Sequence, residues 1–340
     1  MGMDERKRRI LAAVVSLYAD AGEPVGSHLL CNYLDMAVSS ATLRNEMAAL
    51  TKLGLLEQPH TSAGRVPSME GYRYYIENLL EPETGLTAAE KERIDRAFEG
   101  FDYEPERLAK ATAKEISAMT GYTAIATTPK SDDVKVAYFN VIQTGRSNAA
   151  VLSVSSVGGV ATRVAAAERP LNGDDIASIT AYLNRTLCFV SKDDVNPLTE
   201  TLLKEGLGAQ QALWPIVAAA LRLLKGAGRG KVFIAGQEKM LNWPELELSL
   251  KGCLKLLGNT DELQRIISPT TSRTTVLLGD ELEDGKLPGA AIAAKRYLAG
   301  GGRTGTIALL GPSRMPYFKV LPQLEYFAAK LGAAMTGIEG

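Results

Sequence analysis

Cysteine, histidine and tryptophan are scarce in this chain of 340 residues, which has three, two and two of them. The cysteines Cys31, Cys188 and Cys253 are odd in number and widely spaced, so they provide neither a disulfide framework nor the spacing of metal ligands. We expect them to be buried, reduced thiols. His28 and His60 lack the partner arrangement of a zinc site or a Ser-His-Asp site.

Long apolar runs are also absent. No stretch is long enough to span a bilayer, and the charged start at residues 1–9 lacks the apolar core of a signal peptide. We therefore expect no membrane association and a cytoplasmic protein. Hydrophobic residues make up 46% of the chain and charged residues 23%, which is ordinary for a globular protein long enough for two or three domains.

What the chain does contain is a short amphipathic helix at residues 40–53. Leu43, Met47, Leu50 and Leu53 recur at helical spacing and form an apolar stripe. The opposite face carries a different set of residues: Ala41, Arg44, Asn45, Ala48 and Lys52. Arginine and asparagine make paired hydrogen bonds to guanine and adenine edges in the DNA major groove. Ser39 or Ser40 can cap the first turn, whose free amides suit a phosphate.

The neighbouring segments indicate how to interpret this helix. A helix at residues 4–21 ends at Gly22 and Pro24, and Ser27 is predicted to cap a short helix reaching Leu34. A tight connection at residues 35–37 leads into the helix at residues 40–53. Two extended runs around a polar tip at residues 59–64 then predict a hairpin, or wing, and Ser68 caps a further helix. This order is typical of a winged helix-turn-helix, with the third helix in the major groove.

The charge of this region restricts how it binds DNA. Residues 1–80 contain eight basic and nine acidic side chains, and the whole chain has a net charge of −1. Nucleic-acid-binding domains usually carry a basic footprint, so the positive charge has to be concentrated on one face. We place it at Arg6–Arg9, Arg44, Lys52 and Arg65, and we expect binding to depend on specific contacts and dimer symmetry.

The candidate DNA-binding residues divide into two groups. Arg44 and Asn45 are predicted to read bases. In the alternative roles, Arg44 pairs with a glutamate or caps a neighbouring element, and Asn45 holds the turn. Phosphate contact and plain solvated surface are both open for Thr42, Lys52, Ser62, Arg65 and Arg73. His60 is predicted to shape the wing or contact a phosphate. Tyr72, Tyr75 and Ile76 are predicted to lie in the core.

Several segments resemble the bacterial heat-inducible transcription repressor HrcA. They are Glu23–Ser27, Val38–Met47, Gln58–Pro67, Gly71–Tyr75 and, near the end, Gly311–Tyr317. Pro316 stands where the resemblance leads us to expect an acidic residue. The resemblance implies a dimeric repressor of class I heat-shock (chaperone) genes that acts on an inverted-repeat operator called CIRCE and is modulated by the GroE chaperonin. It also implies a winged helix, a GAF-like domain and a dimerisation domain inserted into the latter.

The rest of the chain gives an α+β class and three predicted domains. They are the DNA-binding domain at residues 1–80, the GAF-like domain at residues 86–132 and 227–340, and the inserted dimerisation domain at residues 133–226. β-rich runs at residues 134–142, 149–154 and 160–165 predict an antiparallel meander, followed by helices at residues 174–187, 195–205 and 209–225. The last of these helices is rich in apolar residues, which either face a partner subunit or lie within their own domain. A helix is predicted at residues 88–99, with a capping box of Thr87 and Glu90 at its start. Further helices are predicted at residues 105–120, 241–248, 260–267 and 319–335, and strands at residues 232–235, 274–278, 290–297 and 305–310.

Motifs for catalysis or cofactor binding are not found. Residues 226–231 are rich in glycine, but Val232 follows Lys231 where a phosphate loop needs Ser or Thr. The acidic stretch at residues 279–285 lacks the ligand spacing of a calcium loop. We therefore expect no enzyme and no cofactor. The alternative function is a winged-helix regulator that senses a small metabolite in its GAF-like domain.

Overall fold

The computed structural model describes residues 3–34, 38–60, 63–80, 86–100, 104–131, 133–268, 273–282 and 287–337. The chain forms two compact units, Met1–Thr128 with Lys231–Gly340, and Pro129–Gly230. Helices and strands are mixed, and all strand pairs among the described residues are antiparallel. The α+β class is therefore confirmed. None of the described helices combines the length and the apolar composition required to cross a membrane.

The described residues 3–80, which we call the head, follow the predicted order of elements. They form α1 (Glu5–Ala21), α2 (Ser27–Tyr33), α3 (Ser40–Lys52), the antiparallel strands β1 (Leu56–Glu57) and β2 (Val66–Pro67), and α4 (Met69–Asn78). Leu43, Met47 and Leu50 of α3 are buried in a core shared with Ile10 and Val14 of α1. Leu53, the fourth residue of the predicted stripe, follows the end of α3 and is 40% exposed, so the other three residues fix which side of α3 faces outward. The predicted connection at residues 35–37 lies outside the described residues.

The helix starts in the head use the predicted caps with one exception. The Ser39 hydroxyl accepts a hydrogen bond from the Thr42 amide at 3.2 Å, and the Ser68 hydroxyl accepts one from the Gly71 amide at 2.9 Å. The prediction that Ser27 caps α2 is wrong, because Gly26 holds that position and makes no side-chain bond. The Ser27 hydroxyl instead lies 3.0 Å from the Ser40 hydroxyl and links the starts of α2 and α3.

The rest of the first unit, which we call the body, is built on a five-stranded sheet in the order β7-β3-β10-β9-β8. Its strands are β3 (Thr123–Thr127), β7 (Val232–Ala235), β8 (Thr275–Leu278), β9 (Ala290–Leu298) and β10 (Thr304–Pro312). Its helices are α5 (Ala88–Glu99), α6 (Pro105–Thr120), α10 (Leu250–Gly258), α11 (Thr260–Ile267) and α12 (Tyr317–Gly337). The capping box predicted for Thr87 and Glu90 is present at the start of α5.

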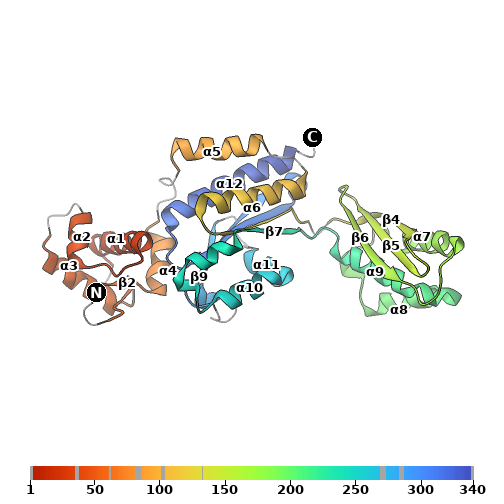
Figure 1. Ribbon diagram of the computed structural model, residues 1–340, viewed down its shortest axis with the longest axis horizontal. Coiled ribbons are helices and arrows are strands. Elements are labelled where there is room, and N and C mark those ends of the chain that lie inside the picture. Colours follow the sequence, from red (N-terminus) through yellow and green to blue (C-terminus); the bar gives the residue numbers. More distant parts are fainter. Residues whose placement is uncertain are drawn as a thin grey trace. The chain divides into compact units, whose positions relative to one another are not determined.

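Neighbouring residues of the body sheet enter two different cores. Ile307 and Leu309 of β10 belong to the core that includes α6, α12 and the head, whereas Ala308 and Leu310 belong to the core with α10 and α11. Helices therefore cover both faces of the sheet (Figure 1). No sequence pattern predicted β3, the fully buried strand between β7 and β10.

One predicted helix of the body is wrong. Residues 241–248 form parts of two short 3₁₀ turns, Gln237–Asn242 and Pro244–Leu246, and α10 begins only at Leu250. Pro244 lies directly after Trp243, and the residue before a proline is disfavoured in helical conformation. Trp243 accordingly has an extended backbone, with φ −118° and ψ 100°.

The second unit, which we call the inserted unit, has a three-stranded sheet in the order β4-β5-β6. The predicted meander is confirmed as β4 (Val136–Gln143), β5 (Asn148–Ser155) and β6 (Val160–Ala166), with α7 (Gly173–Leu187), α8 (Pro197–Gly206) and α9 (Trp214–Gly226) following. The helix predicted at residues 209–225 begins later, because residues 208–213 form a 3₁₀ segment with non-helical Gln210. Pro215 lies in the first turn of α9, where its missing amide hydrogen is tolerated.

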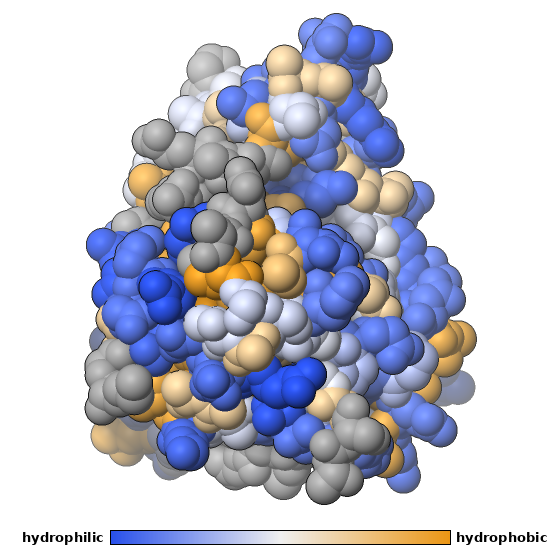
Figure 2. Space-filling view, turned by 90° about the vertical axis from the view of Figure 1, so that its left-hand side faces the viewer, coloured by the Kyte–Doolittle hydropathy of each residue, from blue (hydrophilic) through white to orange (hydrophobic). Residues whose placement is uncertain are grey.

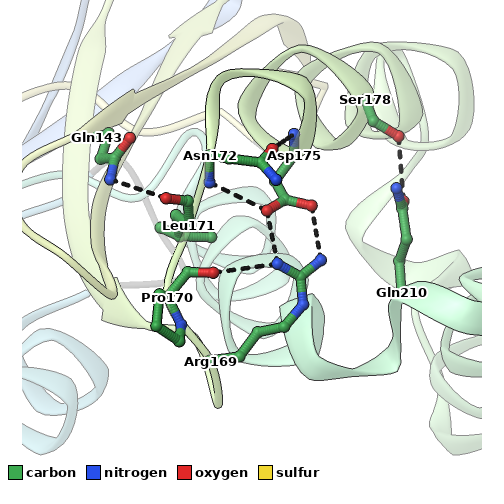
Figure 3. Close-up of polar contacts among 8 residues, drawn as sticks. All are labelled: Gln143, Arg169, Pro170, Leu171, Asn172, Asp175, Ser178 and Gln210. Carbon is green, nitrogen blue, oxygen red and sulfur yellow. Dashed lines mark hydrogen bonds and ion pairs between the residues drawn. The ribbon is translucent and has the colours of Figure 1, made fainter.

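A buried carboxylate fixes the start of α7. Both oxygens of Asp175 accept hydrogen bonds from the Arg169 guanidinium at 2.6 Å, and Asp175 completes a capping box with Asn172 (Figure 3). These bonds from Arg169, together with the amide of Asn172, hold the pKa of Asp175 below its ordinary value although burial opposes the shift. The charged form of Asp175 therefore stabilises the connection between β6 and α7.

Candidate nucleic-acid interface

The outward face of α3 is built as the sequence predicts. Ala41, Arg44 and Asn45 are exposed, Ala48 is half-buried, and Lys52 is exposed at the last turn. Among the residues that the structure describes, neither Arg44 nor Asn45 has a hydrogen-bond or ion-pair partner. The alternative roles, an ion pair or a cap made by Arg44 and a bond of Asn45 within the turn, therefore find no support in the described contacts. Short side chains beside them keep this face narrow enough to approach a groove.

The other candidate residues lie around this face. Ser39 and His60 are exposed, while Ser40, Thr42 and Arg65 are half-buried. The Thr42 hydroxyl lies 3.0 Å from the Ser39 hydroxyl, so the two make a polar rim at the start of α3. The His60 carbonyl accepts the Ala63 amide in the turn of the wing. Ser62 lies outside the described residues.

The positive charge predicted at the start of α1 is only partly available. Lys7 is buried, with its ammonium 2.6 Å from Asp4 and 3.3 Å from Glu46 of α3. The hydrogen bond to Asp4 raises the pKa of Lys7. Arg6 also pairs with Glu46, at 3.6 Å, whereas Arg8 and Arg9 are exposed. Lys7 is therefore a structural link between α1 and α3, and our placing of it on the DNA face is wrong.

Arg65, which directly precedes β2 in the predicted wing, is tied to α3 and to the turn after α1. Its backbone exchanges two hydrogen bonds with Val25, of 2.8 and 2.9 Å, and its Nε donates to the Thr51 hydroxyl at 3.1 Å. Thr51 in turn donates to the Met47 carbonyl of α3. The Arg65 guanidinium is thereby held beside α3. The role of Thr51 could not be predicted, since a threonine near a helix end gives no sequence signal for this contact.

A hollow of 340 Å³ lies between the starts of α2 and α3 and the wing. Its lining combines glycines, small polar residues and two guanidinium groups: Val25, Gly26, Ser27, Arg44, Met47, Gln58, Ala63, Gly64 and Arg65. Arginine forks pair with phosphate oxygens through parallel hydrogen bonds. Two arginines in one concave surface thus create a place that suits an anionic group. Figure 2 faces the head and shows that hydrophilic residues cover most of its surface.

Arg73 does not belong to this interface. Its guanidinium donates to the Val276 carbonyl of the body at 3.0 Å and forms an ion pair with Glu281. The phosphate-contact and solvated-surface roles left open for Arg73 are both replaced by a contact between head and body. Tyr72 and Tyr75 lie in the core as predicted, and Ile76 packs against it half-buried.

Potential metal ligands are scattered over the part of the chain that the structure describes. No group of three or more His, Cys, Asp or Glu side chains within them is placed to hold a metal ion. His28 and His60 are both exposed, His28 on α2 and His60 in the wing. What the head presents is a ridge with two free polar side chains, flanked by arginines.

Comparison with known proteins places this chain among bacterial transcription repressors. Residues 106–321 match the family model described as HrcA protein C terminal domain. The heat-inducible transcription repressors HrcA of Desulforudis audaxviator and Moorella thermoacetica are 33% and 34% identical to it, each over 98% of both chains. The chain therefore belongs to the HrcA family of heat-inducible transcription repressors.

A solved structure supports the fold. A crystal structure of a hypothetical protein at 2.2 Å resolution aligns with 99% of both chains, with a TM-score of 0.63 and 24% sequence identity. At this identity the likeness bears on the fold alone, and it agrees with the mixed helix-and-sheet architecture. Both of the relatives named above are transcription repressors.

Proposed function

We propose that this protein is a dimeric, DNA-binding transcription repressor whose head is a winged helix-turn-helix. The observation that carries the proposal is the pair Arg44 and Asn45, exposed on α3 and without described partners. Arginine and asparagine are the side chains that pair with guanine and adenine edges, so their exposure together on one ridge favours DNA as the ligand. The wing is the segment from β1 to β2.

The proposed contacts divide into base reading and backbone positioning. Arg44 and Asn45 read base edges in the major groove, and Ala41 allows the close approach. Phosphates are contacted by the polar rim and the basic side chains around it: Ser39, Ser40, Thr42, Lys52, His60, Ser62 and Arg65. We place one backbone phosphate on Arg65, whose side chain lines the hollow. The head has only a small basic surface and no net positive charge. Its specificity for a DNA sequence therefore depends on the base contacts of α3.

We place the dimer contact on the outer face of the inserted sheet. The apolar residues of α9 lie within their own unit, since Ile216, Leu221 and Leu224 are buried there, so α9 is not the partner surface. The opposite sheet face leaves Tyr138, Ile142, Val160 and Val164 at least half exposed. The strand register aligns them in rows, Tyr138 with Val154 and Val160, and Ile142 with Ala150 and Val164. Exposed apolar patches of this kind favour association.

The remaining assignments follow the family. A sheet covered by helices on both faces supports a GAF-like body at residues 86–132 and 227–340, with the dimerisation domain at residues 133–226 inserted into it. The targets are class I heat-shock (chaperone) genes in the cytoplasm, through the inverted-repeat operator CIRCE, and the GroE chaperonin keeps the repressor active. DNA affinity then depends on the folded dimeric population, so heat that unfolds part of it lowers operator occupancy without a ligand.

A footprint tests this proposal. The full-length protein is bound to the DNA upstream of its own gene, and its mass is measured under the same conditions. We expect a dimer that protects two half-sites related by two-fold symmetry, their centres separated by a multiple of about 10 base pairs. A monomer, or protection without two-fold symmetry, contradicts the proposal.

A further inference from the structure

The segment Gly311–Tyr317, singled out by the family resemblance, forms a rigid buried turn between β10 and α12. The Ser313 amide donates to the Gly289 carbonyl at 2.7 Å, and the Met315 amide to the Pro312 carbonyl at 3.1 Å. The Tyr317 hydroxyl donates to the Ser313 carbonyl at 2.8 Å, and the Tyr317 side chain is fully buried. Arg314 lies at the centre of this turn. The turn therefore fixes the backbone position from which the long charged side chain of Arg314 extends.

Arg314 reaches from the body to the end of α1 in the head. Its guanidinium donates to the Ala19 carbonyl at 3.0 Å, forms an ion pair with Glu245, and lies 5.1 Å from the centre of the Trp243 ring. The Trp243 ring is stacked on Tyr122 of the body, with centroids 5.2 Å apart. A planar guanidinium can contact the carbonyl, the carboxylate and the aromatic face at the same time, because it donates from separate nitrogens. An ammonium has a single nitrogen and cannot satisfy all three partners in this arrangement.

The end of α1 is shaped to receive this side chain. Gly22 caps the helix in the left-handed conformation, with φ +71°, and a β-carbon there would lie 3.2 Å from the Arg314 guanidinium carbon. Glycine is favoured at such a cap because it has no β-carbon. Helix and arginine are therefore in direct contact, and a tilt of α1 would break the bond to Ala19.

Movement of α1 would carry α3 with it. The two helices share a core through Ile10, Val14 and Leu43, and Glu46 of α3 pairs with Arg6 and Lys7 of α1. Arg73 adds a second link to the body through Val276 and Glu281. In contrast, Tyr72 Oη, Trp243 Nε1 and Glu245 Oε2 are buried here with no described partner. Buried polar groups without partners destabilise the contact between head and body. The bonds made by Arg73 and Arg314 offset this cost.

We propose that Arg314 is a positioning residue for DNA binding, which fixes the direction of α3 relative to the body and thereby restricts the range of half-site spacings that the dimer accepts. The inference rests on the proposed function, because it presupposes two α3 helices on one duplex. It assigns to the Gly311–Tyr317 segment a role at a distance from DNA, through α1. Recognition would then be sensitive to a residue that contacts no base.

A spacing series tests the inference. Full-length wild type, Arg314→Gln and Arg314→Lys are titrated with duplexes whose half-sites are moved apart or together in single base pairs, each step rotating one site by about 35°. Wild type is expected to favour one spacing. Both variants should lose about tenfold in affinity at that spacing and discriminate much less against its neighbours. Lysine should not rescue, since it cannot satisfy all three partners.

Arg303→Gln is the matched control. Arg303 also donates to a backbone carbonyl, that of Gly300 at 3.1 Å, but it precedes β10 whereas Arg314 follows it. Its spacing profile should equal that of wild type. Amide hydrogen exchange in the free protein gives a second readout, with faster exchange at residues 18–25 expected only in the Arg314 variants.

The outcomes separate the two proposals. If the Arg314 variants keep the spacing preference of wild type, the inference is overturned. This holds when affinity is unchanged, and also when it falls equally at all spacings, because a destabilised head alone produces a uniform fall. A wild-type protein without any preference for paired half-sites overturns the proposed function, and the inference with it. A broadened profile with faster exchange at the end of α1 supports the inference.

Discussion

The backbone of Gly64 lies so close to Val25 that a β-carbon at position 64 would overlap the Val25 carbonyl group and lie 2.8 Å from the Pro24 carbonyl carbon. This approach lets Arg65 exchange its two backbone hydrogen bonds with Val25. The wing is thus attached to the turn after α1 at a point where only glycine fits. The position of the Arg65 guanidinium beside α3 depends on that attachment.

Gly64→Ala is expected to displace the wing and weaken DNA binding. The forced separation from Val25 should destabilise the head by about 1–3 kcal/mol and lower operator affinity about tenfold or more. Thermal unfolding and a binding titration measure the two effects. Gly26→Ala is the control, because nothing lies within 4 Å of a β-carbon there, although Gly26 lines the same hollow. It should cost less than about 1 kcal/mol; equal effects of the two variants would contradict the wing attachment.

A charge on the outer face of the inserted sheet should separate the dimer. Val164 is 64% exposed, so Val164→Glu leaves the fold intact but puts a carboxylate into the proposed contact. We expect dimer affinity to fall by about 2 kcal/mol or more, roughly thirtyfold. Analytical ultracentrifugation measures the dissociation constant of the dimer. Leu248→Glu is the control, since Leu248 is 88% exposed in the body, and its dimer should persist. A Val164→Glu dimer as tight as wild type would exclude this face.

The ion pair of Arg169 and Asp175 should make the inserted unit sensitive to acid. An unfolded aspartate takes up a proton near pH ~3.9, and the pKa of Asp175 in the folded chain is lower because Arg169 bonds to its charged form. The stabilisation is therefore complete above that pH and is lost as the pH falls through the folded pKa. Asp175→Asn should cost about 1–3 kcal/mol at pH 7.

Urea unfolding of the full chain, followed by amide exchange at residues 136–187, measures this loss. The difference between wild type and Asp175→Asn should shrink as the pH is lowered below about 4. Asp193→Asn is the control, since Asp193 is an exposed acid of the same unit. A difference that stays constant across this range would show that the charge of Asp175 does not contribute.

Sequence patterns predicted the local structure well where one feature decides it. The stripe Leu43, Met47 and Leu50 fixed the orientation of α3, and hydroxyls at Ser39 and Ser68 marked helix starts correctly. The pattern failed for β3, because Thr123–Thr127 is buried at every position and shows no alternation. It also failed at residues 241–248, where Pro244 interrupts an otherwise helical apolar spacing.

Contacts between segments far apart in the chain could not be predicted from the sequence. Lys7 belongs to a basic run that suggests a DNA-binding surface, yet it is buried against Glu46, and Arg73 turns to the body. Arg314 stands 295 residues after Ala19, and no spacing rule connects them. The metabolite-sensing alternative for the body and the individual DNA-contacting residues stay predictions.

The central claim is that α3 reads bases through Arg44 and Asn45, and paired titrations on specific and unrelated duplexes at several salt concentrations test it most directly. Arg44→Ala and Asn45→Ala should each cost about 1–3 kcal/mol on the specific duplex and relax discrimination, with little change on the unrelated one. Arg65→Ala should weaken both duplexes alike and reduce the salt slope by about one. If Arg44→Ala and Asn45→Ala keep wild-type affinity and discrimination, α3 is not the recognition helix.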